Sequence, residues 1–206
     1  MTTQRGLFIV FEGCDKSGKT TQSKRLEQNL PNSFRQPFPD RSTPVGEILN
    51  TYLQSKVELD GHASHLLFSA NRWEVAEKIK EKLFRGINVI ADRYAYSGVA
   101  CSAVVNDNRQ EFLNWAKNAD RGLPKPDIVI YLDTTLSTIK KRGDFGDERY
   151  ETDLFQSRVA KVFLEDLFDD TYWVVVDGSM HCDYVTKRIN EVVAEHGIKG
   201  KLAKLW

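Results

Sequence analysis

The sequence predicts an α/β fold: a five-stranded parallel sheet with helices on both faces and a short lid. Four short, mostly apolar runs each end at a polar or charged residue, as strands buried on both faces do. Segments of helical pattern fill the intervals between these runs, and strands that alternate with helices form a parallel sheet through right-handed crossovers. A glycine-rich motif directly follows the first run.

The expected elements alternate along the whole chain. The apolar runs place strands at residues 7–11, 87–91, 128–132 and 173–176. Residues 33–38 are a fifth candidate, expected at an edge of the sheet because Pro37 cannot donate a backbone hydrogen bond. Helices are expected near residues 18–30, 43–56, 62–84, 95–105, 109–118, 134–141, 152–168 and 182–195. No linker or repeat interrupts the series, so residues 1–206 are expected to form a single domain.

The composition excludes several classes of partner. Lysine plus arginine balance aspartate plus glutamate at 29 each, which gives no reason to expect binding to nucleic acid or to an anionic membrane. No window approaches the ~20 apolar residues of a membrane span. The three cysteines are widely spaced and odd in number, which fits neither a disulfide framework nor a metal knuckle. A cytoplasmic or nuclear protein is therefore expected.

The glycine-rich motif, Gly13 to Thr20, has the spacing G-x-x-x-x-G-K-[ST] of a phosphate-binding loop. Its glycines allow backbone N–H groups to turn toward a polyphosphate. Lys19 would reach the terminal phosphates, and the Thr20 hydroxyl would hold Mg²⁺. The predicted strand before the motif and the predicted helix after it are the flanks that such a loop requires, which argues against a chance match on a surface turn.

Arg41 follows the predicted edge strand, within the stretch Phe38 to Thr43. Ser42 or Thr43 would cap the next helix, whose N-terminus favours an anion, and an arginine fork suits a phosphate. A solvated loop arginine is the alternative, and these residues alone do not decide between the two.

Phe68 and Arg72 lie four residues apart in the helix expected at 62–84, so they share one helix face, with Asn71 alongside. A planar base could stack on Phe68 while Arg72 donates to a carbonyl on its edge. Alternatively, Phe68 extends a core stripe formed by Leu67, Ala70 and Trp73, and the pattern alone favours this core packing.

Asp92 and Arg93 follow the third predicted strand, where catalytic groups collect in open α/β sheets. Asp92 would orient a Mg²⁺-bound water, and Arg93 would neutralise an acceptor phosphate. An ion pair between these two neighbours is the alternative.

Residues 140–151 are dense in charge and contain two glycines. We expect a mobile lid at about 142–151, which would bring cations to the phosphates and exclude water. An exposed charged loop is the alternative.

Four blocks of sequence carry a family resemblance: residues 66–74 (LLFSANRWE), 92–100 (DRYAYSGVA), 122–127 (GLPKPD) and 148–151 (ERYE). With these motifs in this order, the chain resembles the thymidylate kinases of eukaryotes and poxviruses, which belong to the P-loop nucleoside monophosphate kinases. The resemblance extends from Arg5 to Trp206, and it implies a three-layer P-loop NTPase fold.

The resemblance implies transfer of the γ-phosphoryl of ATP to dTMP with Mg²⁺, by a homodimer. It assigns the ATP site to Gly13, Lys16, Ser17, Gly18, Lys19, Thr20, Thr21, Arg142 and Gly178. It assigns the dTMP site to Asp15, Phe38, Arg41, Phe68, Asn71, Arg72, Arg93, Ser97, Gly98, Cys101 and Tyr150. Catalysis would depend on Lys16, Lys19, Asp92 and Arg93, with the metal at Thr20 and Asp92.

Individual roles follow from the same resemblance. Asp15 should bind the 3′-hydroxyl of the sugar, Phe68 should stack on thymine, and Arg72 should reach its O4. Arg41 and Arg93 should hold the dTMP phosphate. Arg142 should pack on the adenine of ATP.

Two residues depart from the family pattern. Lys16 stands where the family often has an arginine on the transferred phosphate, so Arg149 of the lid is an alternative donor of that charge. Cys101 stands where the family usually has phenylalanine or tyrosine against the sugar, which puts the stringency of substrate selection in question.

Other functions stay open at this point. The chain could phosphorylate another deoxynucleoside monophosphate or a free deoxynucleoside, or bind nucleotides without catalysis. Two acceptor-side arginines favour a monophosphate, because a neutral nucleoside would leave them desolvated without a partner charge.

Overall fold

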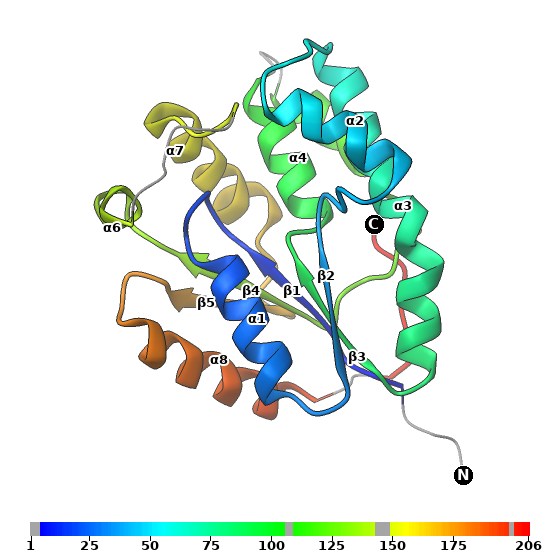
Figure 1. Ribbon diagram of the computed structural model, residues 1–206, viewed down its shortest axis with the longest axis vertical. Helices are drawn as coiled ribbons and strands as arrows, with labels where there is room; N and C mark the ends of the chain where they lie inside the picture. The colour runs from blue at the N-terminus through cyan, green and yellow to red at the C-terminus, as the bar shows by residue number, and fades with distance from the viewer. Residues whose placement is uncertain (1–4, 106–108, 143–148, 198–199) are drawn as a thin grey trace.

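The structure is a computed structural model of the chain, and it describes residues 5–105, 109–142, 149–197 and 200–206 (Figure 1). Five strands form one sheet, in the order β2-β3-β1-β4-β5, and all pairings are parallel. Their bounds are β1 Phe8–Glu12, β2 Ser33–Pro37, β3 Asn88–Asp92, β4 Ile128–Asp133 and β5 Trp173–Asp177. The predicted α/β class, the five parallel strands and the edge position of β2 are confirmed.

Four strands extend one residue beyond their predicted ends, to Glu12, Asp92, Asp133 and Asp177. The polar residue that closes each apolar run still pairs in the ladder: Asp92 is in register with Phe11, and Asp133 with Asp177. The carboxylates at this edge are therefore held by the sheet itself rather than by loops.

The helices also follow the prediction, with bounds α1 Lys19–Asn29, α2 Pro44–Leu53, α3 Gly61–Phe84, α4 Ala95–Val104, α5 Arg109–Ala119, α6 Leu136–Lys141, α7 Asp153–Val162 and α8 Cys182–His196. The single helix expected at 152–168 is wrong in one respect. Its second part is a π-helical segment, η1, over Phe163–Leu167. None of the helices in the described ranges is long and apolar enough to cross a membrane.

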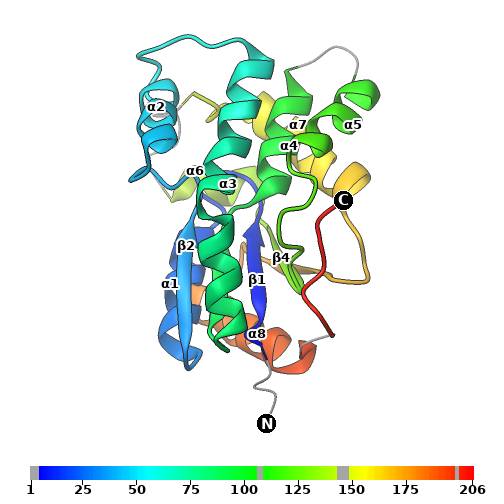
Figure 2. The same cartoon turned by 90° about the vertical axis from the view of Figure 1, so that its right-hand side faces the viewer.

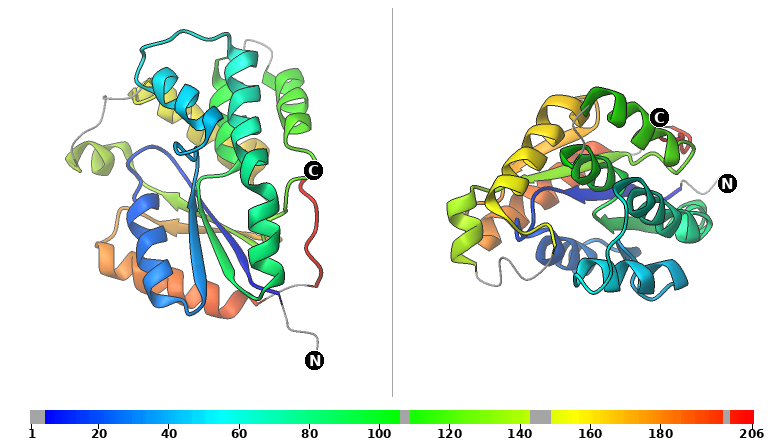
Figure 3. Two further views of the ribbon diagram at one scale, coloured as in Figure 1. Left: turned by 45° about the vertical axis from the view of Figure 1, so that its right-hand side comes forward. Right: turned by 90° about the horizontal axis from the view of Figure 1, so that it is seen from above.

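Two apolar cores lie on opposite faces of the sheet. On one face, Leu26 of α1 and Ile189 of α8 pack against strand residues such as Ile9. On the other face, side chains of α3, α4, α5 and α7 pack together, with Ile79, Val99 and Val159 among them. Figure 3, seen from above, shows α1 and α7 on opposite sides of the sheet. The chain therefore has three layers.

The sheet order creates a crevice at the end of β1. After β1 the chain builds β2 and β3 on one side, and it later adds β4 and β5 on the other. Such a reversal of direction is where open α/β sheets bind ligands, because the loops after neighbouring strands diverge there.

The first half of α3 contradicts the prediction. The expected core stripe is wrong: Leu67 and Ala70 are partly exposed, and Trp73 is 40% exposed. The buried positions in this half are polar, namely Ser64, His65, Ser69, Asn71 and Arg72. Figure 2 shows α3 running past the carboxyl ends of the strands, so this half lies above the sheet rather than on it.

The last residues of the chain run beside the loop that leads into β4 (Figure 2). Pro124 and Lys204 form an isolated bridge, and Leu205 exchanges backbone hydrogen bonds of 3.0 and 2.8 Å with Gly122 and Leu123. This strap also packs Trp206 edge-on against Tyr96 of α4.

Candidate active site

Two cavities open at the carboxyl ends of the strands, and they share Asp15, Thr20 and Arg93 as lining residues. The first has a volume of about 440 Å³ and lies between the phosphate-binding loop, α3 and α4. The second has a volume of about 650 Å³ and lies along the phosphate-binding loop, next to Arg142 and Gly178. We call them the acceptor cavity and the nucleotide cavity.

The phosphate-binding loop has the backbone that its glycines predict. Gly13 has φ 139°, and a Cβ there would lie 2.7 Å from the carbonyl oxygen of Leu132. Any side chain would therefore push the loop off β4. Gly18, with φ 106°, is the N-cap of α1, so the loop passes directly into the positive end of a helix dipole.

Lys19 is buried within this loop. Its Nζ donates to the carbonyl oxygen of Cys14 and lies 3.2 Å from Ser17 Oγ. Burial, followed by repulsion from Arg93, lowers the pKa of Lys19 to about 8. The ammonium is thus held by loop oxygens at the centre of the cradle, where a polyphosphate would be a stronger partner.

The remaining predicted ATP residues gather around the nucleotide cavity, which Lys16, Ser17, Thr21 and Met180 also line. Arg142 donates to the carbonyl oxygens of Lys16 at 3.1 Å, Ser17 at 2.8 Å and Gly178. Its guanidinium therefore ties the end of α6 to both walls of the cavity. Lys16 Nζ lies 3.7 Å from Glu151.

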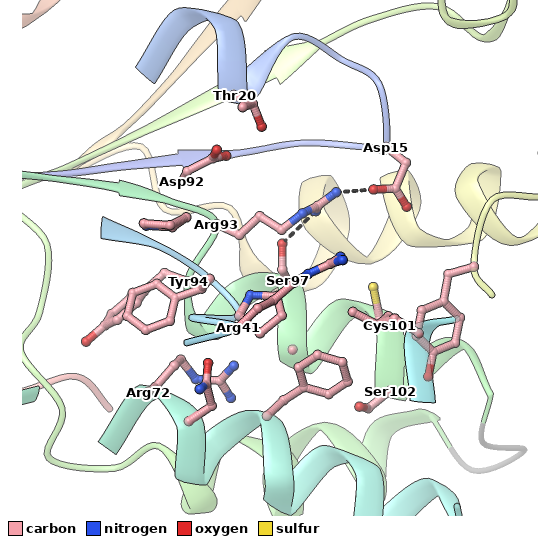
Figure 4. A pocket seen from close by; sticks show the side chains of 18 of the residues that line it. Asp15, Thr20, Arg41, Arg72, Asp92, Arg93, Tyr94, Ser97, Cys101 and Ser102 are labelled. Atoms are coloured by element: carbon pink, nitrogen blue, oxygen red, sulfur yellow. Dashed lines mark hydrogen bonds and ion pairs between the residues drawn. The ribbon is translucent and has the colours of Figure 1, made fainter. Parts of the chain in front are cut away.

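Arg93 lies where the two cavities meet. Its Nη2 donates to Asp15 Oδ1, and its Nη1 lies 3.1 Å from Ser97 Oγ. Gln156 of α7 donates to the other oxygen of Asp15 at 2.7 Å. Burial alone would raise the pKa of the Asp15 carboxyl, but Arg93 and Lys19 outweigh it, so the net shift of this pKa is downward. Figure 4 shows Arg93 reaching between Asp15 and Ser97.

Glu12, at the end of β1, holds the residues around Arg93 in place, and the sequence analysis did not identify this residue. It is fully buried and accepts hydrogen bonds from the backbone N–H groups of Tyr94 and Ser97, at 2.9 and 3.0 Å, and from the Ser97 hydroxyl. Burial raises the pKa of the Glu12 carboxyl. Arg93, between these contacts, has φ 68°, a conformation uncommon for a residue with a side chain. An acidic residue closing an apolar strand is the signal that could have identified Glu12.

All eleven residues predicted to bind the acceptor line the acceptor cavity. Most of them lie on the β2–α2 loop, α3 and α4. Asn71 lines the wall, but its side chain is occupied: it accepts from Asp40 N at 2.7 Å and donates to Asp40 O at 3.0 Å and to Thr43 Oγ1 at 2.8 Å. It braces the loop that carries Arg41, whose Nη1 donates to Asn50 at 2.8 Å.

Phe68 belongs to an aromatic wall of the cavity. It is partly exposed, and its ring meets Tyr52 edge-on at 6.5 Å. The hydroxyls of Tyr52 and Tyr150 are 2.8 Å apart, and Tyr150 stacks on Phe155. The interpretation of Phe68 as part of a core stripe is therefore wrong.

Arg72 has a partner that the sequence did not reveal. Its Nε and Nη2 donate to the fully buried carboxylate of Asp120, at 2.9 and 2.7 Å. A Cβ on Gly98 would lie 2.9 Å from the Arg72 guanidinium, so only glycine leaves room for it. The ion pair fixes the guanidinium plane at the cavity wall and leaves the Nη1 edge for a ligand.

Asp92 is paired with Arg35 rather than with its neighbour Arg93, so the predicted alternative of an Asp92–Arg93 ion pair is wrong. Arg35 also lines the acceptor cavity, and the sequence analysis missed it. Thr20 and Asp92 lie on the same side of this cavity (Figure 4). They present a hydroxyl and a carboxylate, the oxygen donors that Mg²⁺ prefers.

The central part of the predicted lid, residues 143–148, lies outside the described residues. Arg149, at its far end, pairs with Glu58 at 2.7 Å and donates to the carbonyl oxygens of Tyr52 and Val57. It lines neither cavity, so in this structure it is not a donor of charge to the phosphate-binding loop.

Cys101 lines the acceptor cavity and is partly buried. Burial raises the pKa of its thiol to about 12, so the group is neutral. Tyr96, five residues earlier on α4, does not compensate for the small side chain. Its ring packs edge-on against Trp173 at 4.9 Å, on the core side of the helix.

Comparison with known proteins agrees with this geometry. The thymidylate kinase family model matches residues 11–189. The human thymidylate kinase is 43% identical over all of both chains, and that of Danio rerio is 44% identical over 93% of this chain and 92% of its own. A solved structure of thymidylate kinase from Candida albicans superposes with a TM-score of 0.92 at 39% identity, and covers 98% of this chain and 99% of that one. The chain belongs to the thymidylate kinase family.

Proposed function

We propose that the chain transfers the γ-phosphoryl group of ATP to the 5′-phosphate of dTMP, giving dTDP and ADP. ATP occupies the nucleotide cavity and dTMP the acceptor cavity. The observation that carries the proposal is the shared wall of Asp15, Thr20 and Arg93. Two ligands that enter from opposite sides would bring their phosphates together there, beside Lys19.

Thr20 and Asp92 would hold Mg²⁺ in this reaction. In the described part of the chain no group of three or more His, Cys, Asp or Glu side chains forms a metal site. Mg²⁺ is usually bound through one or two protein oxygens, with phosphates and water completing its shell. When bound, Mg²⁺ supplies neutralising charge to the phosphates.

The protein's own contribution is positioning and charge. The loop N–H groups and Lys19 hold the donor phosphates, and Arg93 holds the acceptor phosphate. Arg93 is well suited to this because Glu12, Ser97 and Asp15 fix its direction before any ligand arrives. No general base is needed, since the acceptor is already a phosphate oxyanion at neutral pH.

Base selection belongs to the α3 side of the acceptor cavity, and sugar selection involves Asp15 of the shared wall. Phe68 offers a ring for stacking, and the Arg72 guanidinium offers an N–H edge to a carbonyl of the base. Asp15 would accept from the sugar 3′-hydroxyl. The ion pair with Asp120 supports this role for Arg72, because it removes the rotational freedom that a recognition contact would otherwise cost.

We further propose that the protein is a homodimer. Leu66 and Trp73 are 50% and 40% exposed on α3, and a spacing of seven residues puts them on one helix face. Large apolar side chains on one face are what an interface between two copies would cover.

The acceptor assay tests the central proposal. The protein is incubated with Mg-ATP and, separately, with dTMP, each of the other deoxynucleoside monophosphates, or thymidine, and ADP release is measured. dTMP should be the best acceptor and thymidine should be inactive. Lys19→Met should lower kcat by about 10³-fold while circular dichroism shows a folded protein. ADP release without dependence on an acceptor, or near-normal turnover by Lys19→Met, contradicts the proposal.

The titration of Lys19 should appear in the pH dependence of ATP use. Because its pKa is lowered to about 8, kcat/KM for ATP should fall as the pH rises through about 8, where the free protein loses the ammonium. Lys19→Arg keeps its charge throughout this range. Its kcat/KM should therefore show no such fall, even if its value is lower. A wild-type profile that stays flat well above this pH would show that Lys19 is not titrating there.

Phe68→Ala should raise KM for dTMP by about tenfold and leave KM for ATP unchanged, because a stacking surface is lost on the acceptor side only. Phe84→Ala is the matched control, since Phe84 is also on α3 but is 61% exposed and lines neither cavity. A large loss of thermal stability with an unchanged KM for dTMP would show that Phe68 serves core packing and not substrate binding. Arg72→Gln is a poorer test, because it strands the buried Asp120 at a cost of about 3–5 kcal/mol.

Cys101 should widen the range of acceptors. A thiol in place of a ring leaves room beside the sugar, so a 2′-hydroxyl is rejected less strongly. The Candida albicans enzyme, which is similar to this chain, is described as having broad substrate specificity. Cys101→Tyr should raise the ratio of kcat/KM for dUMP over UMP by roughly three- to tenfold, and Cys101→Ala should leave it unchanged. An unaltered ratio in Cys101→Tyr would mean that this position does not face the sugar.

A further inference from the structure

Asp92 shares its buried carboxylate with Arg35, an arginine that no sequence motif identified. Arg35 Nη2 donates to Asp92 Oδ2, and the two side chains are 13% and 7% exposed. Both residues line the acceptor cavity together with Thr20. The pair therefore lies inside the site rather than on the surface, where an ion pair would be largely screened.

The sheet and α1 hold Arg35 in place. Pro37 is in register with Asp92 across β2 and β3, so Arg35, two residues earlier, points to the same face. There its Nε donates to Ser23 Oγ of α1 at 2.7 Å, and its backbone N–H donates to Glu27 Oε1 at 2.8 Å. The guanidinium is thus fixed by protein groups and not by a substrate.

A fixed cation on Asp92 alters what that carboxylate can do for a second cation. Charges in a poorly solvated site interact more strongly than in water. A divalent cation that approaches Asp92 meets a carboxylate whose charge is already partly balanced, and it is also repelled by the guanidinium.

We propose that Arg35 is a positioning residue that acts through Asp92: it fixes the carboxylate and weakens its hold on the divalent cation of the reaction. The cation then binds mainly with the nucleotide that carries it and leaves with the product. The inference rests on the proposed function, which puts the metal beside Asp92.

The test measures metal binding and not turnover. Mn²⁺ serves as the probe, its free concentration is followed by electron paramagnetic resonance, and the full chain is titrated in the presence of ADP. Arg35→Gln removes the charge and should bind Mn²⁺ about three- to tenfold more tightly. Arg35→Lys keeps the charge and should stay within about twofold of the wild type. Arg35→Met is a second neutral variant should Arg35→Gln fail to fold, which thermal unfolding reports.

Arg25→Gln is the matched control. Arg25 makes an ion pair of 2.6 Å with Asp183 between α1 and α8 and lines neither cavity. Its replacement should leave Mn²⁺ binding unchanged, so any general effect of removing an arginine from this region is accounted for.

Two results overturn the role of Arg35: equal Mn²⁺ affinity in the wild type and in both neutral variants, or tightening that persists in an Asp92→Asn background, since the effect would then not pass through Asp92. A different result identifies failure of the underlying proposal. If Asp92→Asn alone does not weaken Mn²⁺ binding, the metal does not lie beside Asp92, and the proposed metal placement is wrong.

Discussion

The hydrogen-bonded chain from Glu12 through Ser97 and Arg93 to Asp15 is the interaction on which the rest of the site depends. It starts at the end of β1, crosses the N-terminus of α4 and ends in the phosphate-binding loop. Glu12 and Ser97 are buried, and the side chains of Arg93 and Asp15 are only 25% and 24% exposed. Polar groups that are withdrawn from water in this way are costly unless each finds its partner. The loop and α4 therefore cannot shift independently, and the two cavities keep their common wall.

Positive and negative charges are equal in number over the whole chain, and they are also paired within the site. The net charge is zero, yet cations and carboxylates concentrate at one edge of the sheet as Arg93 with Asp15, Arg35 with Asp92, and Arg72 with Asp120. Asp92 belongs to β3, Asp15 to the phosphate-binding loop and Asp120 to the turn after α5. Because these carboxylates hold the arginine side chains, the arginines are directed before a ligand binds. Preorganised charge of this kind costs no rearrangement during the reaction.

The fold and the phosphate-binding loop could be predicted because their signals are local. An apolar run marks a buried strand, and the glycine spacing marks the loop, each within a few neighbouring residues. The partners of the site residues could not be predicted in this way. Arg72 and Asp120 are 48 positions apart, and Arg35 and Asp92 are 57 apart, so only the folded chain brings them together. The polar half of α3 was misjudged for the same reason: its apolar pattern does not reveal that this half rises above the sheet.

The pairing of cations with carboxylates also affects which anions the ligand-free protein binds. A phosphate that arrives at Arg93 must compete with Asp15, and one that arrives at Lys16 must compete with Glu151. A small free anion can engage only one such pair, so it replaces one negative partner with another and gains little. A nucleotide bound as proposed would reach several pairs at once and would add contacts of its base and sugar. The pairing therefore favours nucleotides over small free anions such as inorganic phosphate.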